Sequence, residues 1–381
     1  MSDIKARVRQ GAITVACCAL RPFFRAQRTG ETFAPPRRIL VFRRCCLGDT
    51  LMMTPLLAAL DAAYPEATIT YAVGRWSAAA VVNNPHIDAI LRLPDHPSRR
   101  DWVRIVGKVR RGGFDLALIP ERSPLPALAV ALASVPRRVG LDSAVRGFAL
   151  TDRVPVQGER HETDLALDLA RELGLRADIR RPLYRPSEAA SVHVATLLEA
   201  RGVQEPLLVI HPGGGANPGT TMDMKRWPAE RFAQVAATLR AQLGGSIILV
   251  GAESDRQLVN ATNAALRGDA VDLCAALSLD ELGALCARAT LYIGNDSGTT
   301  HLAEGCGTPV VAIFGPTDPA QYGPTDGIGE AVWDPVSCGP YVQRGDLTRL
   351  TATETFRCID TITVEQVVAA AERVLARAMT R

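Results

Sequence analysis

The chain has 381 residues, of which 47% are hydrophobic and 5% aromatic, and its formal net charge at pH 7 is +3. This length is too great for one ordinary hydrophobic core and is typical of two globular domains. No stretch reaches the roughly 18 uninterrupted apolar residues that a membrane-spanning helix requires, so we do not expect an integral membrane protein.

The positive charge is concentrated in a basic N-terminal extension, which we place at residues 1–37. Residues 1–38 hold eight Lys or Arg residues and two acidic ones, a net charge of +6, so the remaining residues sum to −3. Apolar residues, including Phe23 and Phe24, lie between the cations, a pattern suited to peripheral contact of residues 1–36 with an anionic membrane surface. A disordered tail and a helix packed on the next domain are the alternatives. The apolar stretch is short and has polar flanks, which disfavours a cleaved signal peptide.

Strands and helices alternate through the first half of the chain, as expected of a parallel sheet covered by helices. The predicted strands are 38–43, 67–73, 87–92 and 114–119, and the predicted helices are 50–63, 76–83, 98–111, 123–133 and 161–174. A segment with two prolines, 181–186, breaks this pattern. We therefore assign residues 38–190 to an N-terminal Rossmann-like domain.

The second half repeats the scheme and predicts a C-terminal Rossmann-like domain, 191–381. The predicted strands are 207–211, 246–251, 270–274, 290–294 and 309–314, and the predicted helices are 187–201, 229–243, 254–267, 279–288 and 298–306. A last helix, 363–379, has one apolar face and is expected to pack against a domain, with the N-terminal domain among the candidates.

The first predicted strand leads into a helix through residues 45–50, CCLGDT, which include a carboxylate. Asp49 lies at the carboxyl end of a parallel strand, where open α/β sheets bind their ligands, and Gly48 permits close approach of another molecule. The alternative is that Asp49 caps the helix and interacts with its dipole, with no chemical role.

The first strand of the second domain ends in a glycine run at Gly213, Gly214 and Gly215. Such a run lets the backbone approach a bulky anion. Lys225 follows shortly before the next helix and offers a mobile cation for a phosphate group. A solvated loop lysine is the alternative.

Residues 292–301, YIGNDSGTTH, join a short strand to an apolar helix through small and hydroxyl-bearing residues. Gly298 can adopt a positive φ, and the start of a helix leaves backbone N–H groups unpaired, which suits a phosphate. Asp296 and His301 flank this turn, so a carboxylate could bind sugar hydroxyls beside a diphosphate. The alternative is a capped, buried helix.

Several common nucleotide-binding patterns are missing from the sequence. Neither half has a G-x-G-x-x-G fingerprint or a G-x-x-x-x-G-K-[ST] loop, which counts against a dinucleotide dehydrogenase and a P-loop NTPase. No D-x-D pair is available to hold a divalent cation against a diphosphate. We therefore expect no cofactor and no metal. Backbone amides and a lysine would contact the diphosphate in place of the cation. We also expect no nucleic-acid partner.

The chain has nine cysteines with no C-x-x-C spacing. This pattern disfavours a zinc site and a secreted disulfide framework, so reduced cytosolic thiols are expected.

Blocks of sequence near all three turns together resemble the signature blocks of glycosyltransferase family 9, the ADP-heptose lipopolysaccharide heptosyltransferases and their relatives. The blocks are 43–55 (RRCCLGDTLMMTP), 220–228 (TTMDMKRWP), 294–303 (GNDSGTTHLA) and 307–318 (GTPVVAIFGPTD). The resemblance covers about residues 38–375, and its specificity lies in the combination of the blocks. It implies an α/β fold of the GT-B type, with two doubly wound Rossmann-like domains facing across a cleft. It also implies that the N-terminal domain, 38–190, is the acceptor-side domain and that the C-terminal domain, 191–381, binds the nucleotide-sugar.

The segment around Cys338 and Cys358 is also similar to one found in many members of that family. Pro340 and Tyr341 stand where a second cysteine is expected beside Cys338, which puts a metal role there in doubt.

In such a fold we expect Asp49 to take the proton of the acceptor hydroxyl as that hydroxyl attacks the anomeric carbon with inversion. Lys225 is expected to stabilise the leaving nucleoside diphosphate. The resemblance implies that Asp296 binds hydroxyls of the donor sugar and that Glu253 binds those of the ribose, with an exposed loop glutamate as the alternative for Glu253. The expected donor and nucleotide contacts in full are Thr220, Thr221, Glu253, Asp296, Ser297, Gly298, Thr299, Thr300 and His301.

The expected function is an inverting, metal-independent glycosyltransferase that moves a sugar, a heptose from ADP-heptose, to a lipopolysaccharide-core or related lipid-linked saccharide. Its expected location is the cytoplasm, with peripheral contact to the cytoplasmic face of the inner membrane. The alternatives are a nucleotide-sugar epimerase of similar two-domain fold and a non-catalytic nucleotide-sugar-binding protein.

Overall fold

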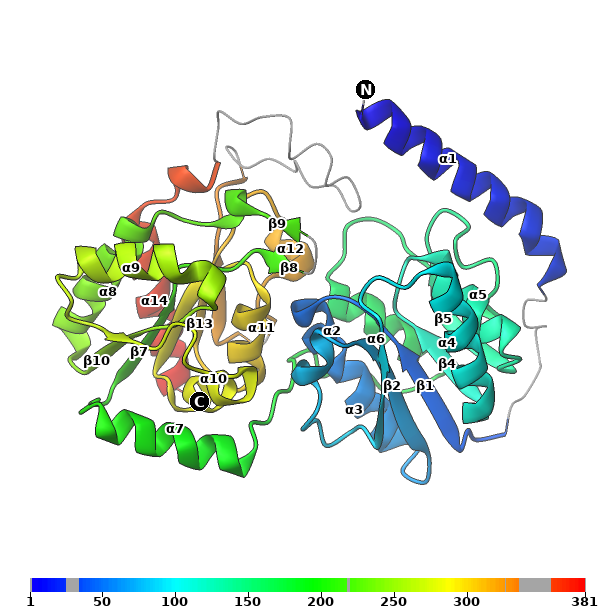
Figure 1. The fold of residues 1–381 in the computed structure, drawn as a ribbon, viewed down its shortest axis with the longest axis horizontal. Coiled ribbons are helices and arrows are strands. Elements are labelled where there is room, and N and C mark those ends of the chain that lie inside the picture. Colours follow the sequence, from blue (N-terminus) through cyan, green and yellow to red (C-terminus); the bar gives the residue numbers. More distant parts are fainter. Residues whose placement is uncertain (1, 25–33, 218–219, 326, 336–357, 381) are drawn as a thin grey trace. The chain divides into compact units, whose positions relative to one another are not determined.

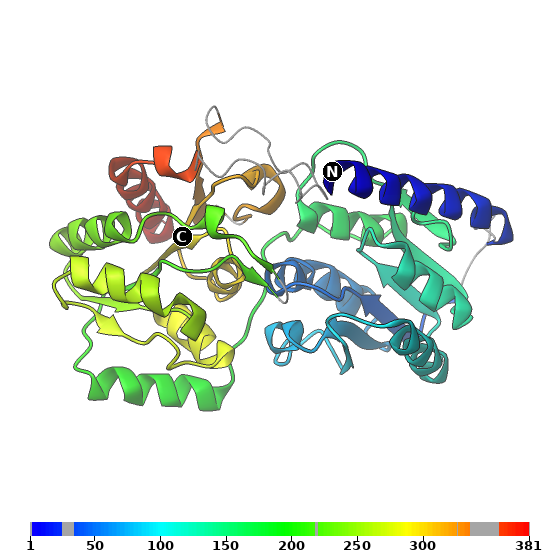
Figure 2. The same ribbon diagram turned by 45° about the horizontal axis from the view of Figure 1, so that its top comes forward.

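The structure is a computed structural model that describes residues 2–24, 34–217, 220–325, 327–335 and 358–380, without the side chains of residues 2–10 and of Thr220. The chain forms two compact units, Met1–Arg180 and Arg181–Arg381. Figures 1 and 2 show a twisted sheet with helices on both faces in each unit. The division comes before the boundary predicted after residue 190. Tyr184 accounts for this, because its N–H donates to the Gly305 carbonyl and its hydroxyl to the Asp280 carboxylate, both in the second unit.

The first unit contains a six-stranded sheet in the order β3-β2-β1-β4-β5-β6. Every strand pair in it is parallel. The strands are β1 (Arg38–Phe42), β2 (Thr68–Gly74), β3 (Ala89–Leu93), β4 (Leu116–Ile119), β5 (Arg137–Asp142) and β6 (Asp152–Pro155). The helices are α2 (Leu47–Met52), α3 (Thr54–Ala63), the 3₁₀ turn η2 (Ser77–Ala80), α4 (Arg99–Gly112), α5 (Pro124–Leu132) and α6 (Glu162–Glu172).

Three features of the first unit differ from the sequence-based expectation. The strands β5 and β6 were not predicted, because both contain arginine and aspartate and neither has a long apolar run. The predicted helix 50–63 is divided into α2 and α3, where Met53 ends the first helix and Pro55 lies in the first turn of the second. The predicted helix 76–83 is only the short turn η2.

The N-terminal extension contains a helix, α1 (Ser2–Leu20), followed by the 3₁₀ turn η1 (Arg21–Phe23). Its C-terminal part packs on the first unit: Cys17 is buried in the core of that unit, and the Phe24 ring contacts Phe148 edge to face at a centroid distance of 5.3 Å. Val15, Leu20 and Phe23 remain exposed. The described part of the extension therefore agrees with the packed-helix alternative. Among the described residues, none of the helices combines the length and the apolar content needed to cross a membrane.

The second unit repeats the same topology, with the order β11-β10-β7-β12-β13-β14 and parallel pairing throughout. Its strands are β7 (Leu207–His211), β10 (Ser246–Leu249), β11 (Val271–Asp272), β12 (Leu291–Asn295), β13 (Val310–Ile313) and β14 (Gly329–Val332), and a small hairpin joins β8 (Ala216–Asn217) to β9 (Thr220–Thr221). Its helices are α7 (Glu188–Ala200), α8 (Ala229–Leu243), α9 (Arg256–Ala265), α10 (Leu279–Arg288), α11 (Gly298–Gly305), α12 (Pro319–Tyr322) and α14 (Val364–Met379), with 3₁₀ turns η3 (Asp223–Lys225), η4 (Glu253–Asp255) and η6 (Cys358–Thr361).

The last helix belongs to the second unit. Val367, Ala370, Ala371 and Val374 of α14 are buried in the same core as α8 and the central strands. In both units the strand order reverses beside the first strand of the sheet, at β1/β4 and at β7/β12. Loops at the carboxyl ends of those strands are where open α/β sheets bind ligands.

Candidate active site

The first group of polar side chains lies at the carboxyl end of β1. Asp49 is the third residue of α2, its side chain is 23% exposed, and its carboxylate forms an ion pair with Arg43 at 2.9 Å. The backbone N–H of Cys46 donates to the same carboxylate oxygen at 3.4 Å. Cys46, and not Asp49, is the N-cap residue of this helix. The protein thus orients the Asp49 carboxylate and leaves part of it accessible.

Arg43 is held by a buried network that the sequence did not predict. Its guanidinium donates to the Pro120 carbonyl at 2.6 Å and lies 3.9 Å from the Glu162 carboxylate, which forms a second ion pair with Arg122 at 2.6 Å. Burial alone would lower the pKa of Arg43, but the carboxylates of Asp49 and Glu162 together with that of Glu121 raise it above its ordinary value. The one signal in the sequence is a charge placed directly after an apolar strand.

The remaining residues of the 45–50 segment differ in part from the expectation. Gly48 is buried within the first turn of α2, so it does not belong to an open glycine-rich loop. Cys45 and Cys46, expected as reduced thiols, are joined by a disulfide. Cys338, also considered above, lies outside the described residues.

A second group lies at the carboxyl end of β12. Asp296 is buried, and its Oδ2 accepts from Lys225 Nζ at 2.6 Å and from the Thr317 hydroxyl at 2.6 Å. Burial raises the pKa of this carboxyl, but Lys225 and Thr317 outweigh that effect and lower it below the ordinary value. The Lys225 side chain is 12% exposed and paired with Asp296, so it is not the solvated loop lysine that the sequence offered as the alternative.

The glycine run after β7 packs against the side chains of Asp255 and Ser297, both in the second unit. A Cβ atom on Gly213 would lie 2.2 Å from Cγ of Asp255, and one on Gly214, whose φ is +97°, would lie 2.8 Å from Cβ of Ser297. The Gly214 N–H donates to the Asp255 carboxylate at 3.2 Å. Gly215 also has a positive φ, +75°. Contacts within the protein therefore already require glycine here.

The turn before α11 is connected to the glycine run through His211. Nδ1 of this ring lies 2.9 Å from the Thr299 hydroxyl and Nε2 lies 3.3 Å from the Asp255 carboxylate. The Ser297 hydroxyl lies 2.9 Å from that of Thr299. These contacts fix the entry to α11, and Gly298 is its first residue.

Thr300 and His301, two of the predicted ligand contacts, interact with other residues of the second unit. The Thr300 hydroxyl donates to the Asn295 carbonyl at 2.6 Å, and its N–H donates to the Ser297 carbonyl at 3.1 Å. His301 is buried, with Nδ1 3.9 Å from the Glu304 carboxylate. These two residues are thus integrated into the structure of the second unit.

Two further predicted contacts lie on other loops. Glu253 is exposed in η4 at the carboxyl end of β10, with its carboxylate 3.5 Å from Arg256. Thr221 lies in β9, paired with Ala216, and the backbone of Thr220 pairs with Asn217.

Three residues with central positions were not predicted. Asp255 receives hydrogen bonds from the Gly214 and Ala252 backbones and contacts His211, and these lower its pKa although burial opposes them. The Asn295 amide donates to the carbonyls of Pro212 and Gly213, and Arg226 donates to the Gly214 carbonyl. The sequence signal for Asp255 was its place in the same strand-end turn as Glu253.

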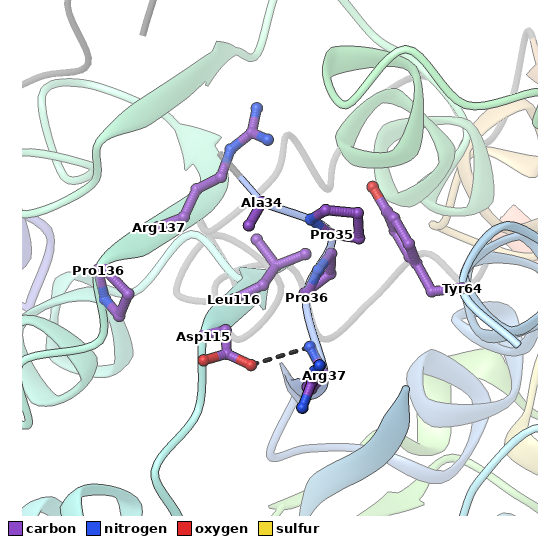
Figure 3. A pocket seen from close by; sticks show the side chains of 9 residues that line it. All are labelled: Ala34, Pro35, Pro36, Arg37, Tyr64, Asp115, Leu116, Pro136 and Arg137. Carbon is purple, nitrogen blue, oxygen red and sulfur yellow. Dashed lines mark hydrogen bonds between the residues drawn. The ribbon is translucent and has the colours of Figure 1, made fainter. Parts of the chain in front are cut away.

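A pocket of about 330 Å³ lies at the opposite, amino-terminal edge of the first sheet, lined in part by Tyr64, Asp115 and Arg137 (Figure 3). Two of its polar side chains have partners: Asp115 accepts from the Arg37 N–H at 2.9 Å, and Arg137 pairs with Asp152 at 3.1 Å. We do not assign the chemistry to this pocket. In the described part of the chain, no cluster of three or more His, Cys, Asp or Glu side chains is arranged to hold a metal ion.

Two Rossmann-like units of the same strand order, each with a carboxylate and a basic side chain paired near the end of a central strand, are the architecture of the GT-B class, to which many glycosyltransferases belong. The sequence profile of glycosyltransferase family 9 (heptosyltransferase) matches residues 102–351. The chain belongs to this family.

Similar proteins agree with the family assignment. The lipopolysaccharide heptosyltransferase 2 of Salmonella typhimurium is 28% identical over 305 residues, which are 74% of this chain and 84% of that protein. The lipooligosaccharide heptosyltransferase 2 of Haemophilus influenzae is 26% identical over 304 residues, 75% of this chain and 85% of that protein.

Two solved structures share the fold. The Escherichia coli ADP-heptose lipopolysaccharide heptosyltransferase II superposes with a TM-score of 0.72 and 21% identity, covering 90% of this chain and 99% of that one. A family 9 glycosyltransferase from Veillonella parvula superposes with a TM-score of 0.73 and 22% identity, covering 90% and 97%.

Proposed function

We propose that this glycosyltransferase transfers a heptose from ADP-heptose to a lipopolysaccharide-core saccharide, with inversion and without a metal ion. The observation that carries the proposal is the Lys225–Asp296 pair at the end of β12, directly before the N-terminus of α11. A helix N-terminus and a lysine suit a diphosphate, and a buried carboxylate beside them suits sugar hydroxyls. The names of the relatives, lipopolysaccharide heptosyltransferases, support the donor and the acceptor.

In the proposed reaction, Asp49 takes the proton of the acceptor hydroxyl. The hydroxyl oxygen forms a bond to the anomeric carbon while the bond from that carbon to the diphosphate oxygen breaks, and the electron pair leaves on the diphosphate. Arg43 keeps the Asp49 carboxylate oriented in the first unit. General-base assistance of this kind contributes roughly 10²–10⁴ in rate.

On the donor side, the charge that develops on the diphosphate is stabilised by Lys225 and by the backbone N–H groups of Ser297, Gly298 and Thr299. Lys225 reaches the diphosphate by shifting from its contact with Asp296, whose carboxylate then accepts from sugar hydroxyls. Glu253 is exposed at the end of β10 and is assigned to the ribose hydroxyls. We assign Thr220 and Thr221 to the diphosphate, and we assign Thr300 and His301 to positioning this turn.

The direct test is to incubate the purified protein with ADP-heptose and truncated lipopolysaccharides that end before or after each core heptose. We expect one acceptor to gain the mass of one heptose with release of one ADP, in excess chelator as well as without it. A strict requirement for a divalent metal would contradict the metal-independent mechanism. Use of GDP- or UDP-sugars in preference to ADP-heptose would contradict the donor.

The two alternatives predict different results in the same assay. A nucleotide-sugar epimerase would convert the donor with no acceptor present. A non-catalytic binding protein would bind ADP-heptose and leave every acceptor unchanged. Either result would replace the transferase proposal.

We also propose that the exposed face of α1 and η1 contacts the anionic cytoplasmic surface of the inner membrane, with the enzyme otherwise in the cytoplasm. Val15, Leu20 and Phe23 are exposed on this segment, and residues 1–38 have a net charge of +6. Exposed apolar side chains and basic residues on one segment are typical of interfacial attachment.

A further inference from the structure

A rigidly held segment at the carboxyl end of β2 displays an aromatic side chain beside the Asp49 helix. Trp76 follows the strand by two residues, and its side chain is 43% exposed. The residues on its C-terminal side, Ser77 and Ala78, are buried in η2, which packs against α2. The exposure of this indole therefore results from the backbone path and not from a loose loop.

Three hydrogen bonds fix the backbone on the N-terminal side of the indole. Gly74 N–H donates to the Arg44 carbonyl at 2.8 Å, Arg75 N–H donates to the Leu93 carbonyl at 3.0 Å, and Trp76 N–H donates to the Asp95 carboxylate at 3.1 Å. Arg44 also donates to the Asp95 carbonyl. The ends of β1, β2 and β3 are thus joined, and the residue that joins them, Arg44, directly follows the arginine that holds Asp49.

The residue before Trp76 carries a positive charge with no partner in the part of the chain that the structure describes. Arg75 is exposed, and its guanidinium forms no ion pair or hydrogen bond with any described residue. An unpaired guanidinium can bind a carboxylate or phosphate with two parallel hydrogen bonds. An exposed, fixed indole offers a flat apolar face of the kind that small-molecule sites use to orient a ligand.

We propose that Trp76 and Arg75 form an acceptor platform, on which the indole stacks against a sugar ring and the guanidinium pairs with an anionic group of the same saccharide. The inference rests on the proposed transferase function and adds two residues of the first unit that hold the acceptor saccharide. The platform places that saccharide beside the helix that carries Asp49. A neutral glycan would bind through the indole alone and therefore with lower affinity.

Kinetics with truncated lipopolysaccharide test the platform. In Trp76→Ala we expect the KM for the acceptor to rise about tenfold, the effect of losing one well-packed aromatic contact, with the KM for ADP-heptose unchanged. Trp76→Phe should restore most of the affinity. Arg75→Gln should raise the acceptor KM by a similar factor, whereas the matched control Arg201→Gln, at an exposed arginine in the second unit, should not. An unchanged acceptor KM in Trp76→Ala and Arg75→Gln would overturn the platform.

A binding measurement separates the failure of the platform from failure of the proposed function, because it needs no turnover. Titration of the wild type with O-deacylated, truncated lipopolysaccharide, without donor, should quench tryptophan fluorescence, and maltotetraose should quench it less. The quenching should disappear in Trp76→Phe and persist in Trp333→Phe. If quenching persists in Trp76→Phe, the platform is wrong whatever the enzyme transfers. If the wild type shows the quenching but transfers no sugar, the transferase proposal fails and the binding site remains.

Discussion

Lys225 Nζ lies 2.6 Å from the Asp296 carboxylate, with the acid buried and the base only slightly exposed. An ion pair of this kind contributes both to the stability of the second unit and to its proposed chemistry. Removing one partner leaves an uncompensated charge, which is strongly destabilising for a buried pair. The functional and structural effects of each residue can therefore be separated only with paired variants.

For Lys225, the expected effect of Lys225→Ala is weaker binding of ADP, by the roughly 1.5–3 kcal/mol of a charge-assisted hydrogen bond. Isothermal titration calorimetry measures this. The variant should also melt at a lower temperature, because Asp296 loses its partner. The double variant Lys225→Ala/Asp296→Asn should regain much of the stability but not the affinity. Unchanged ADP affinity in Lys225→Ala would remove the lysine from the donor site, and Lys108→Ala, at an exposed lysine of α4, serves as the control.

Asp49→Asn tests the proposed general base. The change removes the proton acceptor and almost no volume, so kcat should fall by roughly 10²–10⁴. ADP affinity and the melting temperature should stay close to wild type. Asp61→Asn, at a half-exposed aspartate of α3 that contacts His86, is the matched control and should keep full activity. Wild-type turnover by Asp49→Asn would refute the general-base role, and loss of the folded state would indicate that the carboxylate acts mainly as the partner of Arg43.

The lowered pKa of Asp296 predicts a specific dependence of stability on pH. An unfolded Asp binds a proton near pH 3.9, whereas the native carboxyl binds it only at lower pH, so in this range the unfolded state holds more protons. The contribution of Asp296 is therefore fully present above about pH 4–5 and is lost as pH falls through its native pKa. Urea unfolding between pH 7 and pH 3 should show a smaller loss of stability in Asp296→Asn than in the wild type. Identical pH profiles for the two proteins would contradict the lowered pKa.

Adjacent phenylalanines separate the two roles of the N-terminal segment. Phe23 is 82% exposed, whereas the Phe24 ring packs on Phe148. Phe23→Ser should leave the melting temperature unchanged and reduce binding to anionic vesicles. Phe24→Ala should destabilise the first unit, by about 1–3 kcal/mol given partial burial, without reducing vesicle binding of the folded protein. Unchanged vesicle binding in Phe23→Ser would leave α1 and η1 as structural elements only.

The sequence alone predicted the two parallel sheets, because central strands such as β1, β7 and β12 are short apolar runs followed by small or polar residues. It also placed Asp49 and Asp296 at the ends of central strands, since a strand-to-helix turn is a local pattern. The edge strands β6 and β14 and the strand next to β6, β5, were missed. Edge strands are partly exposed and so need no continuous apolar sequence.

Only the tertiary structure decided which charges meet. Arg43 pairs with Asp49 six residues away, but its other partner, Glu162, comes from a helix more than a hundred residues later. Lys225 meets Asp296 across 71 residues of sequence. Asp255 likewise contacts the glycine run, which is distant from it in sequence. The exposure of Trp76 depends on Arg44 and Asp95, which lie on other segments. Local patterns set the identity and position of each side chain along an element. Partners and burial depend on sheet order and packing, which bring together residues distant in sequence.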